Sequence, residues 1–313
     1  MKAIQMKCYG HSDVLSFESI DIPKTGPLDL LIKVHAIGIN LVDLKFLNGK
    51  FPGAHKPNFP ITFGSDFAGE IVEKGYLVEN FKKGDKVYGS GFVFSGGTGA
   101  LAQYIRVNHN NISLIPEGLD YVVAASVVTS GCTAQEAVNI NLNIKPNQKV
   151  LIHGAGGSVG YLATQLALSI GAEVAVTVSD KDIELMKGLG VDLIINYQIQ
   201  NFEDIIKDYD AVLDTQGGSV LKKSYNAIRP GGKIVSLVEQ PDKNELLRKR
   251  ATGSHQHTLI NTIRLNTLSF LIEEKIITPR RPYSDIFNNA IVAIDNKLNI
   301  NNPKKLVITI PNT

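Results

Sequence analysis

The chain has 313 residues, of which 43% are hydrophobic and 20% are charged, and its formal net charge is +2 at pH 7. This composition is typical of a globular protein, and the length predicts two domains, each with a core of its own. A net charge so near zero gives no general attraction to nucleic acid or to an anionic membrane, and no apolar run is long enough to cross a bilayer.

The N-terminal residues and the cysteines exclude two further classes of protein. Met1 to Gly10 carry two lysines and no apolar core, so they do not form a secretory signal, and we expect a cytoplasmic protein. The two cysteines, Cys8 and Cys132, lie far apart in the sequence. A structural zinc lobe needs about four closely spaced ligands. We therefore expect no such lobe and interpret both cysteines as small buried hydrophobes.

The first 120 residues or so are predicted to be rich in β-strands. Apolar or alternating runs are separated there by glycine, proline and asparagine, which is typical of strands joined by turns. The runs cover Leu30–Ile37, Ala68–Glu73, Lys86–Gly89 and Ala102–Val107.

Beyond Pro116 the pattern changes to helices alternating with short strands. This alternation predicts a doubly wound parallel sheet. The expected strands are Lys149–His153, Glu173–Val178, Leu193–Asn196, Ala211–Asp214 and Lys233–Val238. A further helix is expected over Leu259–Glu274, and the tail Leu306–Ile310 is expected to form a strand that could return to the first domain.

A glycine cluster joins the first of those parallel strands to the helix that follows it. The strict pattern G-x-G-x-x-G is not met, because a register that starts at Gly154 ends on Val159. The register that fits has Ala155, Gly157 and Gly160 in the three places. A strand, a tight turn and a helix N-terminus bring free backbone N–H groups and a positive helix end to one point, which binds a pyrophosphate. The loop therefore predicts dinucleotide binding, and a plain flexible turn is the alternative.

Several further motifs follow one another in a specific order and spacing. They are His35–Asp43, Phe63–Gly69, Phe81–Val87, Gly131–Ala134, Ile195–Tyr197 and Arg229–Gly232. With these motifs the chain resembles the medium-chain dehydrogenase/reductase superfamily, specifically its zinc-free quinone oxidoreductase branch, over essentially its whole length. The resemblance implies an α/β fold with a Rossmann domain over residues 122–261 and a GroES-like β-rich catalytic domain over residues 1–121, to which residues 262–313 return. It also implies a homodimer.

The positions of the zinc ligands in related alcohol dehydrogenases hold other residues in this chain. Asn40 stands in place of a cysteine, and Ser65-Asp66 stands in place of a histidine–glutamate pair, so we expect no metal. Reducing an isolated carbonyl produces an alkoxide, which needs a Lewis acid or a strong proton donor. A quinone or an activated alkene gives a delocalised oxyanion that a few hydrogen-bond donors can stabilise. The expected acceptors are therefore quinones, enones or alkenals.

Three residues of one segment are candidates for catalysis. Asn40 could hydrogen-bond the cofactor or the acceptor oxygen, and a turn asparagine is the alternative. Asp43 could orient a water or a lysine, or it could only cap a helix over Leu44–Leu47. The spacing of Lys45 resembles that of plant enone oxidoreductases, in which a lysine reaches the ribose or nicotinamide region of the cofactor. A solvated lysine on a short helix is the alternative for this residue.

The cofactor candidates follow from the glycine loop, the end of the next strand and the resemblance. Ser179 leaves room for a 2′-phosphate and Lys181 supplies charge for it, whereas Asp180 would repel a phosphate if it pointed inward. We therefore expect NADPH in preference to NADH. Thr133 matches a family threonine near the nicotinamide, or it could be the N-cap of a helix over Ala134–Val138. The remaining candidates are Gly156, Gly157, Ser158, Val159, Gly160, Tyr197 and Leu237, besides Lys45.

Together these features predict an NADPH-dependent oxidoreductase that acts on small-molecule quinones or α,β-unsaturated carbonyls, without nucleic-acid or membrane partners. The alternative is an NADPH-binding structural or regulatory protein with little or no turnover. Such a protein would need the glycine loop but neither Lys45 nor Asn40.

Overall fold

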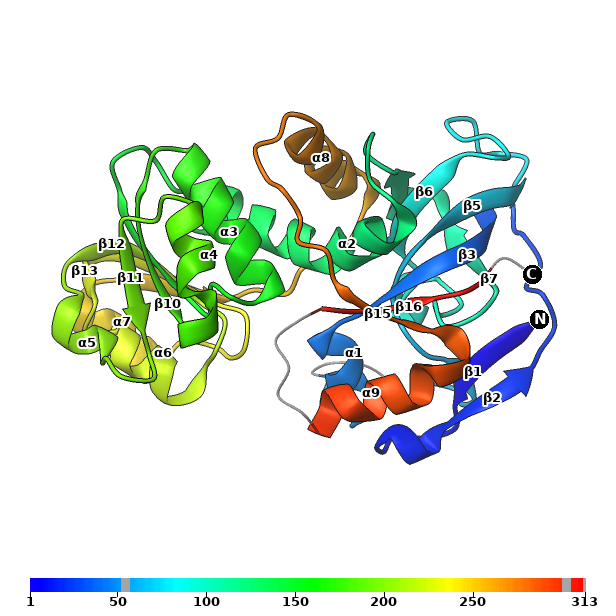
Figure 1. Ribbon diagram of the computed structural model, residues 1–313, viewed down its shortest axis with the longest axis horizontal. Coiled ribbons are helices and arrows are strands. Elements are labelled where there is room, and N and C mark those ends of the chain that lie inside the picture. The colour runs from blue at the N-terminus through cyan, green and yellow to red at the C-terminus, as the bar shows by residue number, and fades with distance from the viewer. Residues whose placement is uncertain (52–56, 300–304, 312–313) are drawn as a thin grey trace. The chain divides into compact units, whose positions relative to one another are not determined.

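The computed structural model describes residues 1–51, 57–299 and 305–311, and the chain forms two compact units (Figure 1). The first unit comprises Met1–Thr129, Ile260–Glu273 and Pro279–Thr313, and the second comprises Ser130–Leu259 and Glu274–Thr278. The division falls inside helix α2 (Tyr121–Gln135), whereas the sequence predicts a boundary after Tyr121, the first residue of that helix.

Among the described residues, the second unit contains a six-stranded sheet in which every pairing is parallel. Its strand order is β11-β10-β9-β12-β13-β14, which places the first strand of the unit in the middle, as in the Rossmann fold. The strands are β9 (Lys149–His153), β10 (Glu173–Val178), β11 (Leu193–Asn196), β12 (Tyr209–Asp214), β13 (Ile228–Ser236) and β14 (Thr252–His255). The predicted doubly wound fold is confirmed, and β9, β10 and β11 begin and end at the predicted residues.

Helices connect these strands and pack against the sheet: α3 against β9 and β10, α4 against β11, α6 against β12 and α7 against β13 (Figure 1). Apolar side chains of the strands, with those of α5, α6 and α7, form a core cluster that includes Leu151, Phe202 and Val212. The helices are α3 (Ser158–Ser169), α4 (Ile183–Gly188), α5 (Phe202–Ile205), α6 (Gly218–Ser224) and α7 (Lys243–Lys249).

The described residues of the first unit form a seven-stranded sheet and a three-stranded sheet. The larger sheet runs β15-β16-β3-β5-β6-β8, with β7 also paired to β3, and the smaller runs β2-β1-β4. The strands are β1 (Lys2–Met6), β2 (Leu15–Ser19), β3 (Asp29–Ile39), β4 (Ile61–Thr62), β5 (Asp66–Lys74), β6 (Lys86–Ser90), β7 (Tyr104–Asn108), β8 (Ile112–Leu114), β15 (Tyr283–Ile286) and β16 (Leu306–Thr309).

The returning C-terminal strand completes this sheet. Strand β16 pairs antiparallel with β3, with Leu306 opposite Ile39 and Thr309 opposite Ala36, so the predicted return of the tail is confirmed. The helices of this unit are α1 (Leu41–Leu47), α8 (Thr262–Glu273) and α9 (Ala290–Asn299), together with most of α2.

Two local predictions are wrong. Helix α2 begins at Tyr121 and continues as a π-helical turn over Glu136–Asn141, so Thr133 lies well inside a helix and does not cap one. Cys132 is buried as expected, but Cys8 is exposed. Within the described ranges, none of the helices combines the length and the apolar character that crossing a bilayer requires.

Candidate active site

The glycine loop of the second unit has the geometry of a phosphate cradle. Strand β9 ends at His153, Gly154 adopts a left-handed conformation with φ of +67°, and α3 begins at Ser158 after the N-cap Gly157. The first N–H groups of a helix have no partner within the helix. The N–H groups of Ser158, Val159 and Gly160 therefore lie where an anion is held by a helix N-terminus.

Two glycines of the loop are required by close contacts. A Cβ atom on Gly160 would lie 2.4 Å from the carbonyl oxygen of Gly154, and one on Gly156 would lie 2.2 Å from a carboxylate oxygen of Asp182. Real Cβ atoms do not approach other atoms so closely, so a side chain at Gly160 would push the loop backbone apart, and one at Gly156 would displace the Asp182 carboxylate. The residues present therefore fit a cofactor whose pyrophosphate approaches the backbone closely.

Buried His153, the last residue of β9, contacts side chains that hold the start of the glycine loop in place. The His153 ring lies 3.1 Å from Thr177 Oγ1 through Nδ1 and 3.0 Å from Ser224 Oγ through Nε2. Burial lowers the pKa of this imidazole to about 3, so it is neutral at physiological pH. Thr177 also accepts the Gly154 N–H at 3.2 Å. His153 thus has the contacts of a structural residue that fixes the start of the loop.

A pocket of about 310 Å³ lies at the ends of β10 and β11. It is lined by Ser179, Asp180, Lys181, Tyr197 and Gln198, so it brings together Ser179 and Lys181, which the sequence predicts for the 2′-phosphate, and the cofactor candidate Tyr197. Sequence reasoning missed Gln198, which stands directly after Tyr197.

Asp180 is oriented by neighbours on the adjoining strand. Its backbone N–H donates to Gln198 Oε1 at 2.8 Å, and its carboxylate lies 3.5 Å from Asn196 Nδ2. Ser179 Oγ donates to Asp182 Oδ2 at 3.3 Å. The Asp180 carboxylate, which would repel a phosphate, therefore lies against Asn196, the last residue of β11.

The last two cofactor candidates lie elsewhere in the second unit. Thr133 is buried in α2, and its carbonyl oxygen accepts a hydrogen bond from Gln256 Nε2 at 3.0 Å. Leu237 follows the last residue of β13, and its N–H donates to Asp214 O at 2.9 Å. Their contacts with a cofactor stay predictions.

In the first unit, Asn40 lies between β3 and α1, and the other two predicted catalytic residues, Asp43 and Lys45, lie on α1. Asn40 is the N-cap of α1, and its backbone N–H donates to the Asp43 carboxylate at 2.7 Å. The helix-capping alternative for Asp43 is thus present in the structure. Both residues are buried, with exposed fractions of 7% and 2%.

The Asn40 side chain joins a buried cluster of charged and polar groups. Its Nδ2 donates to Asp66 Oδ2 at 2.8 Å, and its Oδ1 accepts from the ammonium of Lys305. Asp66 also accepts from Thr129, at 3.0 Å from the backbone N–H and 2.7 Å from the hydroxyl. Lys305 Nζ lies 3.6 Å from Asp66 Oδ2. Sequence reasoning missed Lys305 and Thr129, and no local pattern in the chain marks either one.

Asp43 lies close enough to this cluster for the charges of Asp66 and Lys305 to change its pKa. Burial, and secondly the negative charge of Asp66, raises the pKa of Asp43 to about 6. Hydrogen bonds from Asn40 and Ser65 and the charge of Lys305 act in the opposite direction. Desolvation dominates, so Asp43 takes up a proton at mildly acidic pH.

The raised pKa of Asp43 predicts a pH-dependent stability. Between the unfolded value of 3.8 and the folded value of about 6, the folded state binds more protons than the unfolded state. The free energy of unfolding therefore falls as the pH rises through this window, by about 3 kcal/mol from this group. The neutral variant Asp43→Asn, which keeps an acceptor for the Asn40 N–H, is expected to gain stability relative to wild type between pH 4 and pH 7. Urea unfolding at both pH values measures this gain, and an equal difference at both would contradict it.

Lys45 differs from Asn40 and Asp43 because its side chain is half-buried rather than buried. Within the part of the chain that the structure describes, the Lys45 ammonium has no hydrogen-bond or ion-pair partner. It follows Asp43 by two positions on α1, whose N-terminus the buried cluster fixes. Lys45 is therefore a cationic donor that remains available to a ligand.

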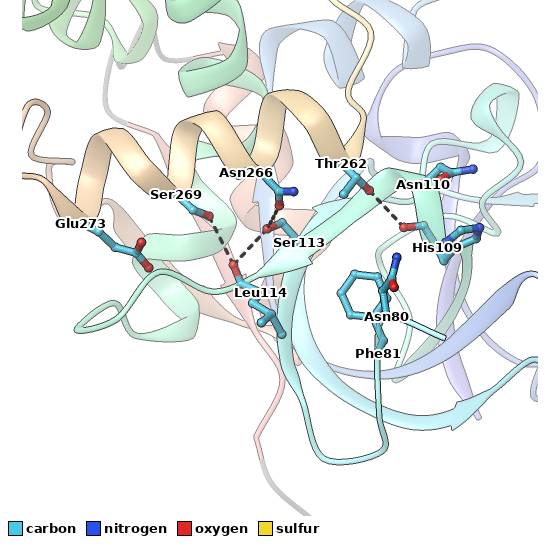
Figure 2. A pocket seen from close by; sticks show the side chains of 10 residues that line it. All are labelled: Asn80, Phe81, His109, Asn110, Ser113, Leu114, Thr262, Asn266, Ser269 and Glu273. Carbon is cyan, nitrogen blue, oxygen red and sulfur yellow. Dashed lines mark hydrogen bonds between the residues drawn. The ribbon is translucent and has the colours of Figure 1, made fainter. Parts of the chain in front are cut away.

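A second pocket, of about 520 Å³, lies in the first unit between α8 and β8 and contains none of the predicted site residues (Figure 2). Its polar side chains are already used to join these two elements. Thr262 Oγ1 donates to Ile112 O at 2.7 Å, and Ser113 Oγ donates to Asn266 Oδ1 at 2.7 Å. We therefore interpret this pocket as a groove between packed elements.

No three His, Cys, Asp or Glu side chains gather to hold a metal ion within residues 1–51, 57–299 and 305–311. At the position of the zinc ligands in related alcohol dehydrogenases, Asn40 and Asp66 instead bond to Lys305. The metal-free site stays a prediction.

Comparison with known proteins gives the family. Residues 26–117 match the family described as alcohol dehydrogenase GroES-like domain, and residues 158–271 match zinc-binding dehydrogenase. The chain is 36% identical over 244 residues to the chloroplastic NADPH-dependent alkenal/one oxidoreductase of Arabidopsis thaliana. That match covers 76% of this chain but only 62% of the relative, which is less than two thirds of its length.

Two further relatives match over a larger share of their own length. The human quinone oxidoreductase is 30% identical, over 75% of this chain and 72% of that protein. The structure of the quinone oxidoreductase from Coxiella burnetii is 31% identical and superposes with a TM-score of 0.89 over 99% of both chains. The chain therefore belongs to the quinone and enone oxidoreductase branch of the medium-chain dehydrogenase/reductase superfamily.

Proposed function

We propose that this protein is an NADPH-dependent oxidoreductase that reduces quinones or α,β-unsaturated carbonyls without a metal. The observation that carries the proposal is the Lys45 ammonium, which has no partner among the described residues and lies on a helix whose N-terminus is fixed by buried hydrogen bonds. A preorganised cationic donor of this kind stabilises a developing oxyanion. The names of the Arabidopsis and human relatives support the same acceptors.

We assign cofactor binding to the second unit. The backbone N–H groups at the start of α3 would hold the pyrophosphate, and Gly156 and Gly160 leave the space that it needs. Lys181, with Ser179 and Gln198 beside it, would bind the 2′-phosphate in the pocket at the end of β10. When bound, the nicotinamide supplies the hydride.

We assign stabilisation of the reduced acceptor to the first unit. Reduction of an enone or a quinone leaves negative charge spread over a conjugated oxygen, and Lys45 would donate a hydrogen bond to that oxygen. The side-chain amide of Asn40 is bonded to Asp66 and Lys305 at its two ends. We therefore propose that Asn40 orients the segment that carries Lys45.

The proposal includes the partners and the compartment. The partners are the small-molecule acceptor and NADPH, with no nucleic acid or membrane, and the protein is a cytoplasmic homodimer. Sedimentation of the purified protein would test the dimer.

The test of the activity is NADPH oxidation by the purified protein against a panel of quinones, enones, alkenals and simple ketones. We expect turnover with at least one of the first three classes, and turnover with simple ketones at least about a hundredfold slower. Reduction of simple ketones alone would contradict the proposal. Tight binding of NADPH, measured by fluorescence, without turnover of any acceptor would favour a non-catalytic NADPH-binding protein.

A further inference from the structure

The buried cluster beneath α1 is built from segments that are far apart in the sequence. Asn40 and Asp43 come from the junction of β3 and α1, Asp66 is the first residue of β5, and Lys305 directly precedes β16. The Asp66 side chain is fully buried, and the Lys305 side chain is 10% exposed. Charges so deeply buried are costly unless they are paired and hydrogen-bonded.

Strand β3 makes room for the lysine. A Cβ atom on Gly38 would lie 3.2 Å from Lys305 Cε and 2.2 Å from the carbonyl oxygen of Ala125. Glycine at this position therefore lets the lysine stem pass between β3 and α2 to reach the cluster.

The ammonium determines which way the Asn40 amide faces. Lys305 has only donors, and the Asp66 carboxylate has only acceptors. With Oδ1 of Asn40 on the ammonium and Nδ2 on Asp66, both contacts are favourable. A flipped amide would place its NH₂ group against the ammonium and its oxygen against the carboxylate. Lys305 and Asp66 together therefore allow only one orientation.

Lys305 is also a cation whose charge acts on both carboxylates. Burial lowers the pKa of Lys305, while Asp66 and Asp43 act to raise it. Burial, and secondly the charge of Lys305, lowers the pKa of Lys297 on α9, so the two lysines repel each other. Without the Lys305 ammonium, Asp66 would keep its hydrogen bonds from Asn40 and Thr129 but lose its cationic partner, and the oxygen end of the Asn40 amide would lose the donor that holds it.

We propose that Lys305 is a positioning residue of this enzyme: its buried ammonium locks Asn40 and Asp66 under the N-terminus of α1 and thereby orients the helix that presents Lys45 to the acceptor. This inference rests on the proposed function. It assigns to the last strand of the chain a role in acceptor reduction that Lys305 performs through Asn40, without touching the acceptor.

Four variants test the inference: Lys305→Met, Asp66→Asn, the double variant with both changes, and the control Lys50→Met. Methionine keeps the length of the lysine stem and removes the charge. Lys50 is an exposed lysine just after α1 and touches none of the cluster. Melting temperature, NADPH affinity and steady-state kinetics with a quinone or enone acceptor are measured for each.

We expect Lys305→Met to lower kcat at least about tenfold, with the Kd for NADPH changed less than threefold and the melting temperature lowered on the order of 10 °C. Adding Asp66→Asn removes the uncompensated carboxylate, so the double variant is expected to recover most of the lost stability. It should not recover kcat, because nothing then orients Asn40. The double variant also keeps the test valid if Lys305→Met alone does not fold. Lys50→Met should match wild type in all three measurements.

Two results would overturn the inference. One is a kcat for Lys305→Met within twofold of wild type. The other is a double variant that recovers activity together with stability, since Lys305 would then serve folding alone.

A further measurement separates this inference from the proposed function. Solvent exchange of the Asn40 side-chain amide protons, followed by NMR, should be slow in wild type and in Lys50→Met and at least about tenfold faster in the double variant. If wild type reduces no acceptor at all, the proposed function fails, and slow exchange that depends on Lys305 would still support the positioning of Asn40. Equal exchange in all variants would overturn it.

Discussion

Replacing Lys45 with methionine is expected to lower kcat/KM for quinone or enone reduction at least about tenfold, while NADPH binding stays measurable. The variant keeps the aliphatic stem and removes only the ammonium, which has no partner among the described residues. A donor that bonds to charge developing in the transition state acts on the chemical step, so the loss should appear in kcat. Steady-state kinetics with one quinone and one enone, together with NADPH titration by fluorescence, measure the two effects separately.

Lys50→Met is the matched control, because it removes the charge of an exposed lysine near the same helix. It should leave both parameters within twofold of wild type. Unchanged turnover in Lys45→Met would remove Lys45 from the mechanism and favour the solvated-lysine alternative. A loss confined to NADPH affinity would instead make Lys45 a cofactor contact.

The parallel sheet was predictable because its signals are local. Strands buried on both faces are continuous apolar runs, and Lys149–His153 and Glu173–Val178 are bounded by polar residues and glycine. The glycine loop follows directly on the first of these strands. The prediction of dinucleotide binding therefore required only neighbouring residues.

The buried cluster could not be predicted in the same way. Lys305 and Asn40 are separated by 265 positions, and Thr129 and Asp66 by 63. Only the pairing of β16 with β3 and the packing of α2 bring these residues together. In the sequence Lys305 is one lysine before a short apolar run, which is equally typical of a solvated residue.

The error at Thr133 has a different physical cause. A threonine before a helical stretch is typical of an N-cap, so one interpretation made Thr133 the cap of a helix over Ala134–Val138. The helix actually begins at Tyr121, twelve residues before Thr133, where Asp120 accepts the Val123 N–H at 2.8 Å. Residues 131–133 are buried, and packing of this kind outweighs the low helix propensity of glycine.

The pocket at the end of β10 leads to a prediction about cofactor choice. Changing Ser179 to Asp and Lys181 to Ala together is expected to lower the preference for NADPH over NADH at least about a hundredfold, which corresponds to about 3 kcal/mol. The new carboxylate would repel a 2′-phosphate and bond to the ribose hydroxyls of NADH. The lost lysine would remove a charge-assisted hydrogen bond. The ratio of kcat/KM values for the two cofactors, with one acceptor at a fixed concentration, measures the change.

The two single variants separate the two causes. Lys181→Ala should weaken NADPH alone, and less so as the salt concentration rises, because Lys181 is exposed and its attraction is screened. Ser179→Asp should weaken the binding of NADPH and strengthen the binding of NADH. Lys187→Ala on α4, whose side chain pairs with Glu184 at 2.7 Å, removes a similar charge outside the pocket and should leave the ratio unchanged.

The orientation of the Asp180 carboxylate determines whether the wild-type pocket accepts a 2′-phosphate. This carboxylate lies against Asn196, and the Asp180 N–H is bonded to Gln198, so the wild-type pocket can accept a phosphate despite an acidic residue in its lining. If Asp180 instead turned toward the ribose, wild type would already prefer NADH, and Ser179→Asp would change the ratio less than threefold. Asp180→Asn distinguishes these cases: it should leave the ratio nearly unchanged if the carboxylate faces Asn196. A strong gain in NADPH affinity in that variant would show that the carboxylate faces the cofactor and would overturn the assignment of NADPH.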